Sequence, residues 1–209
     1  MDLRLIVITD ATLSQPRGVE AVVRAALEAG APAIQLRDKH ADAGALFDQT
    51  RRLLPLVHGH GARLFVNDRL DVALAAGADG VHLGPDDIPL RHARRIAPRP
   101  FLIGCSTDDP GEAAELERAG ADYIGCGAVF GTTSKADLAG ERIGPKGLRA
   151  VIEAVGIPVV GIGGVTPENA RDVVAVGAAG VAVIGAVMAS DHPGEAVRRL
   201  LSAFGAVSR

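Results

Sequence analysis

Aromatic residues, tryptophan and net charge are all scarce in this chain. Of its 209 residues, 3% are aromatic, none is tryptophan, and the formal net charge is −3. Proteins that bind nucleic acids use aromatic side chains to stack on bases and basic surfaces to attract phosphates. The sequence therefore predicts no general affinity for nucleic acid or for an anionic membrane, and any anion site must be local.

Long hydrophobic runs and cysteine are scarce as well. At the amino terminus only four apolar residues, Leu5–Ile8, follow Asp2 and Arg4, which is too few for a signal-peptide core or a membrane span. Cys105 and Cys126 lie in separate apolar runs without CxxC spacing, so we expect buried free thiols rather than a disulfide or a metal pair. These features predict a cytoplasmic protein that does not associate with a membrane.

Glycine, in contrast, is abundant, and it marks a repeated boundary. Ala/Gly-rich segments at 28–31, 76–80, 119–122 and 176–180 each separate a helix-like run from a short apolar run. Glycine is favoured at the left-handed position that ends many helices, so each segment is typical of a helix-to-strand joint. The joints therefore predict a chain in which helix and strand alternate.

The pattern gives eight strand–helix pairs. The predicted strands are 3–9, 33–37, 63–67, 80–83, 101–106, 123–127, 158–163 and 181–185. The predicted helices are 19–29, 43–57, 70–76, 90–97, 110–119, 145–155, 167–176 and 194–204. Eight such pairs, with proline near several helix starts and no linker, predict an α/β protein formed by a single (β/α)₈ TIM barrel over residues 1–209.

The end of the second predicted strand carries an unusual group of hydrogen-bond donors. In the segment Gln35–Lys39, strand alternation places Gln35, Arg37 and Lys39 on one face and Leu36 on the other. Charged donors turned toward the interior of a small protein indicate an anionic ligand, because burying them without a partner is costly. The alternative is a solvated edge strand with its charges in water.

Carboxylates follow the next two predicted strands. Asn67 and Asp68 come after the third strand, and Asp87 comes after the fourth. In a TIM barrel the working residues lie at the carboxyl ends of the strands, so we expect these groups to be neighbours. Hard oxygen ligands beside a cationic strand are suited to Mg²⁺ with phosphate oxygens, which predicts one Mg²⁺ per subunit. For any single aspartate, an Asx-turn or a helix N-cap is the alternative.

Later loops suggest a second anion site. Gly163-Gly164 and Gly185 follow the seventh and eighth strands, where barrels often bind phosphate through backbone N–H groups with the help of a short extra helix. A plain tight turn is the alternative there. The long connection 128–144 carries Lys135 among hydroxyl residues, which is typical of a lid that closes on a charged substrate or, alternatively, of a solvated loop. His82 lies within the fourth strand, and we interpret it as a core or polar-layer histidine.

Together these segments resemble the motifs of the thiamin phosphate synthase family. The similarity extends from about Ile6 to Gly185 and is carried by Gln35–Lys39, Asn67-Asp68, Gly80–Gly84 with Asp87, Gly104–Ser106, Ala121–Gly125, Thr132, Ser134, Lys135 and Gly161–Gly164. It implies that the protein joins 4-amino-2-methyl-5-hydroxymethylpyrimidine diphosphate to carboxythiazole phosphate or hydroxyethylthiazole phosphate. The products would be thiamin phosphate and diphosphate, formed by a dissociative reaction through a pyrimidine cation.

The resemblance also implies three groups of site residues, of which Arg37, Ser106 and Lys135 would be catalytic. The pyrimidine diphosphate would be bound by Gln35, Leu36, Arg37, Asp38, Lys39, Asn67, Ser106 and Lys135. The thiazole phosphate would be bound by Thr132, Thr133, Ser134, Gly164, Ile184 and Gly185. Mg²⁺ would be bound by Asp68 and Asp87.

The sequence departs from the family pattern at four positions and leaves other readings open. Asp108 replaces a frequent His, Pro85 a Gln, Ala128 a Pro, and Gly185 a Ser whose hydroxyl usually contacts phosphate. One alternative is thiazole tautomerase, a relative with the same fold that uses a His as proton shuttle where this chain has Asp108. Another is a phosphate-ligand sensor that binds without turnover. The sequence also leaves open whether the protein is a homo-oligomer and which thiazole phosphate it uses.

Overall fold

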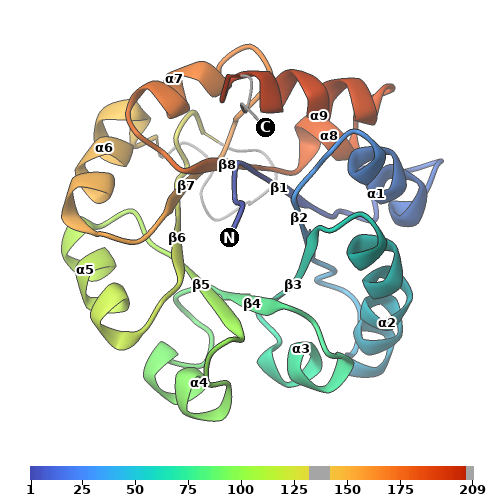
Figure 1. The fold of residues 1–209 in the computed structure, drawn as a ribbon, viewed down its shortest axis with the longest axis horizontal. Helices are drawn as coiled ribbons and strands as arrows, with labels where there is room; N and C mark the ends of the chain where they lie inside the picture. The colour runs from blue at the N-terminus through green and yellow to red at the C-terminus, as the bar shows by residue number, and fades with distance from the viewer. Residues whose placement is uncertain (132–141, 206–209) are drawn as a thin grey trace.

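The fold is a closed barrel of eight parallel strands surrounded by helices (Figure 1). The computed structural model describes residues 1–131 and 142–205. The strands are β1 (Leu5–Ile8), β2 (Ala33–Leu36), β3 (Arg63–Asn67), β4 (Gly80–Leu83), β5 (Leu102–Ser106), β6 (Tyr123–Cys126), β7 (Val159–Ile162) and β8 (Gly180–Val183). Neighbouring strands pair in chain order, and β8 closes the barrel against β1. The prediction of a (β/α)₈ TIM barrel is confirmed.

The helices lie outside the strands and alternate with them. They are α1 (Val19–Glu28), α2 (Ala43–Gly59), α3 (Leu70–Ala76), α4 (Leu90–Ile96), α5 (Pro110–Ala119), α6 (Gly144–Ala154), α7 (Ala170–Ala175), α8 (Gly185–Met188) and α9 (Pro193–Ser202). The predicted seventh helix begins three residues late, because Asn169 Oδ1 accepts the N–H of Thr166 at 2.8 Å in a turn before α7. The short helix α8 had no predicted bounds.

The helix-to-strand joints have the expected backbone geometry. The φ angles are 95°, 77°, 102° and 99° at Gly30, Gly77, Gly120 and Gly177. The second glycine of two joints has a different role, because Gly80 and Gly180 begin strands. A Cβ at Gly180 would lie 1.7 Å from the carbonyl oxygen of Leu3, so at this position glycine is required by close packing of the β8–β1 seam.

The strands form the apolar core, as expected for a parallel sheet covered by helices. Every residue of β1, β2, β6 and β8 is buried. Cys105 and Cys126 are buried free thiols, as predicted, and burial raises the pKa of each to about 12, so both stay protonated at neutral pH. Among residues 1–131 and 142–205, no helix has the length and apolar character of a membrane span.

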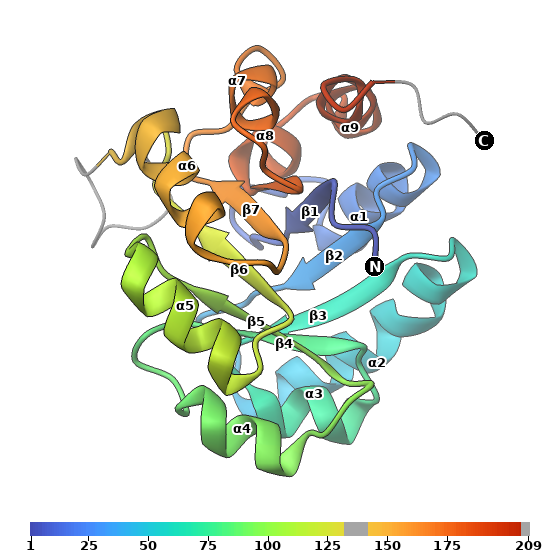
Figure 2. The ribbon, with the colours of Figure 1, turned by 60° about the vertical axis from the view of Figure 1, so that its left-hand side comes forward.

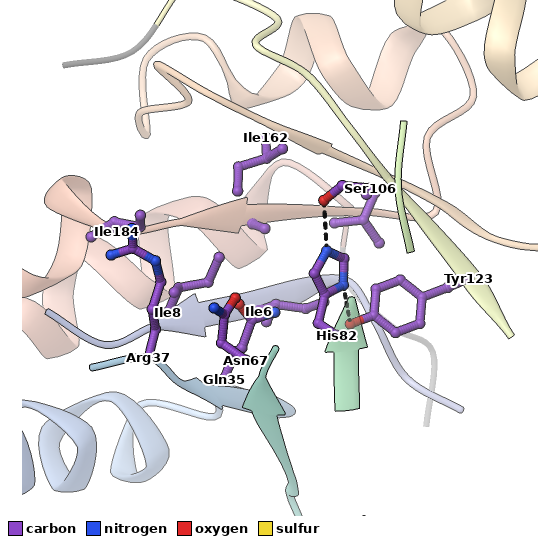
Figure 3. Close-up of a pocket in the computed structure, with 13 residues that line it drawn as sticks. Ile6, Ile8, Gln35, Arg37, Asn67, His82, Ser106, Tyr123, Ile162 and Ile184 are labelled. Atoms are coloured by element: carbon purple, nitrogen blue, oxygen red, sulfur yellow. Dashed lines mark hydrogen bonds between the residues drawn. The ribbon is translucent and has the colours of Figure 1, made fainter. Parts of the chain in front are cut away.

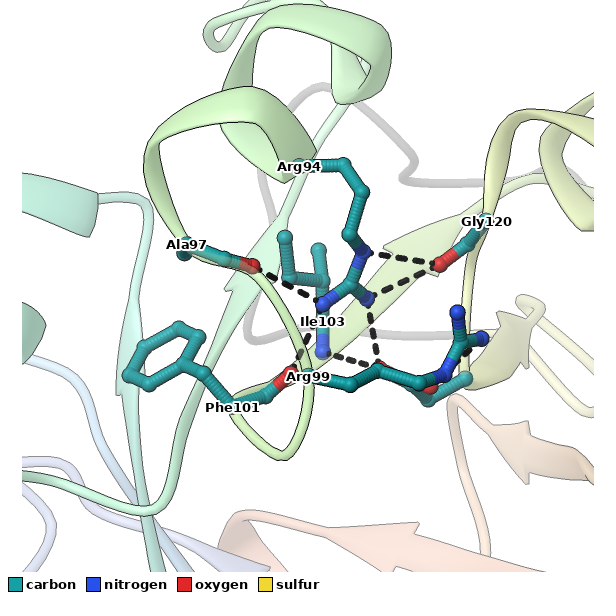
Figure 4. A network of polar contacts seen from close by, with 7 residues as sticks. Arg94, Ala97, Arg99, Phe101, Ile103 and Gly120 are labelled. Atoms are coloured by element: carbon teal, nitrogen blue, oxygen red, sulfur yellow. Dashed lines mark hydrogen bonds and ion pairs between the residues drawn. The ribbon is translucent and has the colours of Figure 1, made fainter.

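A partly buried ion pair joins the elements around β5 and β6 (Figure 4). The carboxylate of Asp122 accepts the N–H of Ile103 at 2.7 Å and a guanidinium N–H of Arg94 at 2.6 Å. Arg94 also donates to the carbonyl oxygens of Ala97, Phe101 and Gly120. Two repeats earlier, Asp79 accepts the N–H of Leu64 at 2.8 Å. In both places, an aspartate just before a strand accepts a backbone N–H of the preceding strand, which links β4 to β3 and β6 to β5.

This arrangement predicts unequal roles for two arginines that contact Asp122. The side chains of Arg94 and Asp122 are 14% and 10% exposed, whereas Arg99, whose guanidinium lies 3.2 Å from the other carboxylate oxygen, is 64% exposed. We expect Arg94→Met to lower the free energy of unfolding by about 3 kcal/mol, because it removes the less exposed of the two cations that compensate the Asp122 carboxylate. The matched control Arg99→Met should cost less than about 1 kcal/mol. Equal losses in urea denaturation would contradict this assignment.

Candidate active site

The parallel strands all end at one side of the barrel (Figure 2). A small pocket opens there (Figure 3). Its wall has two sides of different chemistry. The polar side comes from β2 to β6 and consists of Gln35, Arg37, Asn67, His82, Ser106 and Tyr123. The opposite side, from β1, β7 and β8 with the residue that follows β8, consists of Ile6, Ile8, Val160, Ile162, Ala182 and Ile184.

The end of β2 supplies the cationic part of the pocket. Gln35 and Arg37 are 3% and 9% exposed and both line the pocket, while Leu36 packs in the core on the other face, as strand alternation predicts. Thr9 fixes this strand end, because its hydroxyl oxygen accepts the N–H of Arg37 at 2.9 Å and donates to the Arg37 carbonyl at 3.1 Å. Lys39 is exposed at the rim. The donors therefore face the barrel mouth rather than an outer edge.

The two carboxyl groups after β3 and β4 meet as expected. Asp68 and Asp87 lie close enough to act on each other's charge, and Asp87 Oδ2 accepts the N–H of Gly84 at 2.6 Å. Burial and the charge of Asp87 raise the pKa of Asp68 to about 6, while Arg37 and Lys39 act in the opposite direction. The cationic side chains of Arg37 and Lys39 are thus close enough to the Asp68 carboxyl group to act on its charge. Carboxylates that repel each other are a donor set that fits a divalent cation with oxygen ligands.

The backbone of Asp68 is itself unusual. Among the described residues, it is the one non-glycine residue with a positive φ, at 63°. Its N–H donates to the carbonyl oxygen of His82 at 2.8 Å, which ties the end of β3 to β4. Asn and Asp tolerate this left-handed conformation better than other side chains, although it still costs free energy. The strained backbone therefore holds the carboxylate against Asp87.

The glycines after β7 have a steric role. Gly163 and Gly164 have φ angles of 93° and 65°, and a Cβ at Gly164 would lie 2.5 Å from the carbonyl oxygen of Gly131. The N–H of Phe130 donates to the carbonyl oxygen of Gly163 at 2.9 Å. Close packing of these two loops therefore explains why glycine is needed. Phosphate binding by Gly164 stays a prediction.

The loop after β8 leaves space for a ligand. Ile184 is buried, and Gly185 begins the short helix α8, as expected for a phosphate-binding loop of this kind of barrel. The first N–H groups of a helix have no partner within it, so they are available to an anion. A Cβ at Gly185 would have no atom nearer than Leu13 Cδ1 at 4.0 Å. At Gly185, unlike Gly164, a side chain would fit.

Several predicted site residues lie elsewhere. Asp38 accepts a hydrogen bond from Gln49 and the N–H groups of His40 and Ala41, which lower its pKa and indicate a role in its own turn. Asp108 and Pro85 are exposed, and Ala128 is buried. Thr132, Thr133, Ser134 and Lys135 lie outside the described residues, as does most of the 128–144 connection that we expect to act as a lid.

Two pocket residues were missed as candidates for function. His82 lies in the polar interior layer, as predicted, but it also hydrogen-bonds Ser106 Oγ at 2.8 Å and the Tyr123 hydroxyl at 3.0 Å (Figure 3). Strand alternation in Gly80–Leu83 could have pointed to His82, since it is the polar residue between two buried apolar ones. Nothing in the sequence near Tyr123 indicates that its hydroxyl reaches β4.

The fold and the site define a class of protein. It is a (β/α)₈-barrel enzyme whose mouth combines buried donors with a pair of carboxylates, which suits a phosphorylated small molecule and a divalent cation. Comparison with known proteins identifies the member of that class. A family model described as "Thiamine monophosphate synthase" matches residues 5–187. The chain belongs to the thiamine monophosphate synthase family.

Its relatives are similar over nearly their whole length. The chain is 47% identical to a thiamine-phosphate synthase of Methanospirillum hungatei over 95% of this chain and 96% of the relative. It is 46% identical to the thiamine-phosphate synthase of Natronomonas pharaonis, over 99% and 97%. Among solved structures, thiamine phosphate pyrophosphorylase from Pyrococcus furiosus superposes with a TM-score of 0.88 at 44% identity, covering 97% of this chain and 95% of that one.

The carboxylate pair gives a prediction about stability without metal. The pKa of Asp68 is raised from 3.8 to about 6, so the stability that this group provides at low pH is lost as the pH rises through about 6. At pH 8 without Mg²⁺, Asp68→Asn should therefore raise the thermal midpoint by about 2–4 °C, since Asn keeps the left-handed backbone and removes the repulsion. The exposed neighbour change Asp86→Asn should not. A lowered midpoint in Asp68→Asn would show that the pair is not under electrostatic strain.

Proposed function

We propose that this chain condenses 4-amino-2-methyl-5-hydroxymethylpyrimidine diphosphate with a thiazole phosphate, carboxythiazole phosphate or hydroxyethylthiazole phosphate, to give thiamin phosphate and diphosphate, with release of carbon dioxide when the thiazole carries the carboxyl group. Relatives that bear the name thiamine-phosphate synthase and match nearly the whole chain support this activity. The structural observation that carries it is the meeting of Arg37 and Lys39 with Asp68 and Asp87 at the barrel mouth. A diphosphate complexed with a divalent cation satisfies both signs of charge there.

Each side of the pocket has a proposed role in binding. Arg37 and Lys39 would bind diphosphate oxygens, and Gln35, Asn67 and Ser106 would orient the pyrimidine ring. Asp68 and Asp87 would hold one Mg²⁺ per subunit, which supplies positive charge that stabilises the departing diphosphate. Lys135, outside the described residues, would add a further cation. Leu36 and Asp38 belong to the same segment, Gln35–Lys39, and would contribute to pyrimidine diphosphate binding by holding that segment in place.

The proposed chemistry is dissociative. The bond between the pyrimidine methylene carbon and the diphosphate oxygen breaks, and its electron pair leaves with the diphosphate. The carbocation that remains is captured by the lone pair of the thiazole nitrogen, so no general base is required. Ile8, Ile162 and Ile184 form an apolar wall opposite the donors. That wall would keep water from capturing the cation before the thiazole does.

The thiazole phosphate would bind at the loops after β6, β7 and β8. Backbone N–H groups of Gly164, Ile184 and Gly185 would contact the phosphate, together with Thr132, Thr133 and Ser134. The ligands are then small phosphorylated molecules.

The alternatives make different predictions. A thiazole tautomerase needs a proton shuttle, and this chain has the exposed Asp108 where such a relative has His. A phosphate sensor would bind the same ligands without forming thiamin phosphate. An assay of purified protein with both substrates and Mg²⁺ distinguishes the synthase from the tautomerase and the sensor, because thiamin phosphate forms only if the chain is a synthase.

We expect Asp87→Asn to lower the Mg²⁺-dependent rate of thiamin phosphate formation by at least about 100-fold, because it removes half of the anionic ligand set. Asparagine retains an oxygen that can accept the Gly84 N–H, so the fold should persist. Asp86→Asn, one residue away and exposed, is the matched control and should keep the wild-type rate. Unchanged turnover in Asp87→Asn would refute the metal assignment.

Position 185 offers a test that should increase affinity. The space around Gly185 admits a side chain, so Gly185→Ser should add one hydrogen bond to the thiazole phosphate and lower its KM about tenfold. Gly185→Ala controls for the added Cβ and should leave KM unchanged. If Ser and Ala behave alike in steady-state assays, the phosphate does not bind at the start of α8.

A further inference from the structure

A chain of hydrogen bonds runs along the floor of the pocket from β5 through β4 to β6 (Figure 3). Ser106 Oγ lies 2.8 Å from His82 Nε2, and His82 Nδ1 lies 3.0 Å from the Tyr123 hydroxyl oxygen. The side-chain amide of Gln35 lies beside the same tyrosine hydroxyl. Tyr123 and Gln35 are 1% and 3% exposed, so the far end of the chain is closed to solvent.

The chemistry of the buried end sets the direction of the chain. Burial raises the pKa of Tyr123 far above its usual range, so the phenol keeps its proton. A buried O–H group needs an acceptor, and His82 Nδ1, 3.0 Å from the Tyr123 hydroxyl oxygen, provides one. The hydroxyl therefore donates its one proton to His82 Nδ1. His82 Nε2 then carries the ring proton and donates to Ser106 Oγ.

The barrel interior is shaped to hold these two rings. A Cβ at Gly104 would lie 2.1 Å from Cζ of Tyr123, and a Cβ at Gly125 would lie 2.9 Å from Cε1 of His82. The Tyr123 ring also packs edge-on against Phe65, with centroids 5.6 Å apart. Glycines on β5 and β6 thus provide the room that the rings fill, and the rings have little freedom to turn.

We propose that His82 and Tyr123 are positioning residues that orient the Ser106 hydroxyl as a hydrogen-bond donor toward a lone pair of the pyrimidine diphosphate. With one lone pair of Ser106 Oγ occupied by His82, the O–H is left to point into the pocket. The identity of the acceptor rests on the proposed function, whereas the direction of the chain does not.

A double-mutant cycle tests whether Tyr123 acts through Ser106. Tyr123→Phe keeps the ring and removes the hydroxyl, and we expect it to lower kcat/KM for the pyrimidine diphosphate about 5–10-fold, the effect of one hydrogen bond. In a Ser106→Ala background the same change should alter kcat/KM less than twofold, because there is no longer a hydroxyl to orient. Equal losses in both backgrounds would overturn the proposal, since a merely structural role would be additive.

A second measurement uses the substrate-free wild-type chain and is independent of catalysis. In ¹⁵N-edited NMR of the histidine side chains, with the His82 signals assigned by their loss in His82→Gln, we expect the neutral tautomer with the proton on Nε2. In Tyr123→Phe the preference for this tautomer should weaken. A wild-type His82 with its proton on Nδ1 would refute the direction of the chain. A correct tautomer in a protein without synthase activity would instead place the failure in the proposed function.

Discussion

The repulsion between Asp68 and Asp87 is the interaction around which the barrel mouth is organised. Parallel pairing places the ends of β3 and β4 side by side, and Asp68, with its left-handed backbone, lies at the end of β3 near Asp87. Partial burial makes two charges at this point unfavourable, and the cationic end of β2 offsets only part of the cost. A folded chain that keeps such a pair gains a site whose charges are balanced when a cation and an anion arrive together.

The floor of the pocket explains how that mouth is held in place. Phe65, His82 and Tyr123 fill the interior of the barrel where glycines on neighbouring strands leave space. Thr9 fixes the end of β2 by two hydrogen bonds to Arg37. A site built on strand ends over a packed floor is more rigid than one built on loops alone. Rigidity matters here because an electrostatic site stabilises a leaving group best when its dipoles are already oriented.

Much of this could be predicted from the sequence, and the missing parts share a cause. Apolar runs and left-handed glycines gave all eight strands within a few residues, because both signals are local. Alternation along β2 correctly placed Arg37 and Leu36 on opposite faces. Contacts between strands were not predictable, since the hydrogen bond from Tyr123 to His82 joins residues 41 positions apart. For the same reason the packing of the Phe130 loop against Gly163 and Gly164 was not predicted. The hydrogen bond from Gln49 to Asp38 was not predicted either.

The central claim is that cationic and acidic groups act together on a metal-bound diphosphate. Titration calorimetry with inorganic diphosphate, with and without Mg²⁺, tests it most directly. The account predicts that each ligand strengthens binding of the other by at least about tenfold, a coupling of about 1.4 kcal/mol. Diphosphate that binds equally well in the absence of Mg²⁺ would contradict it.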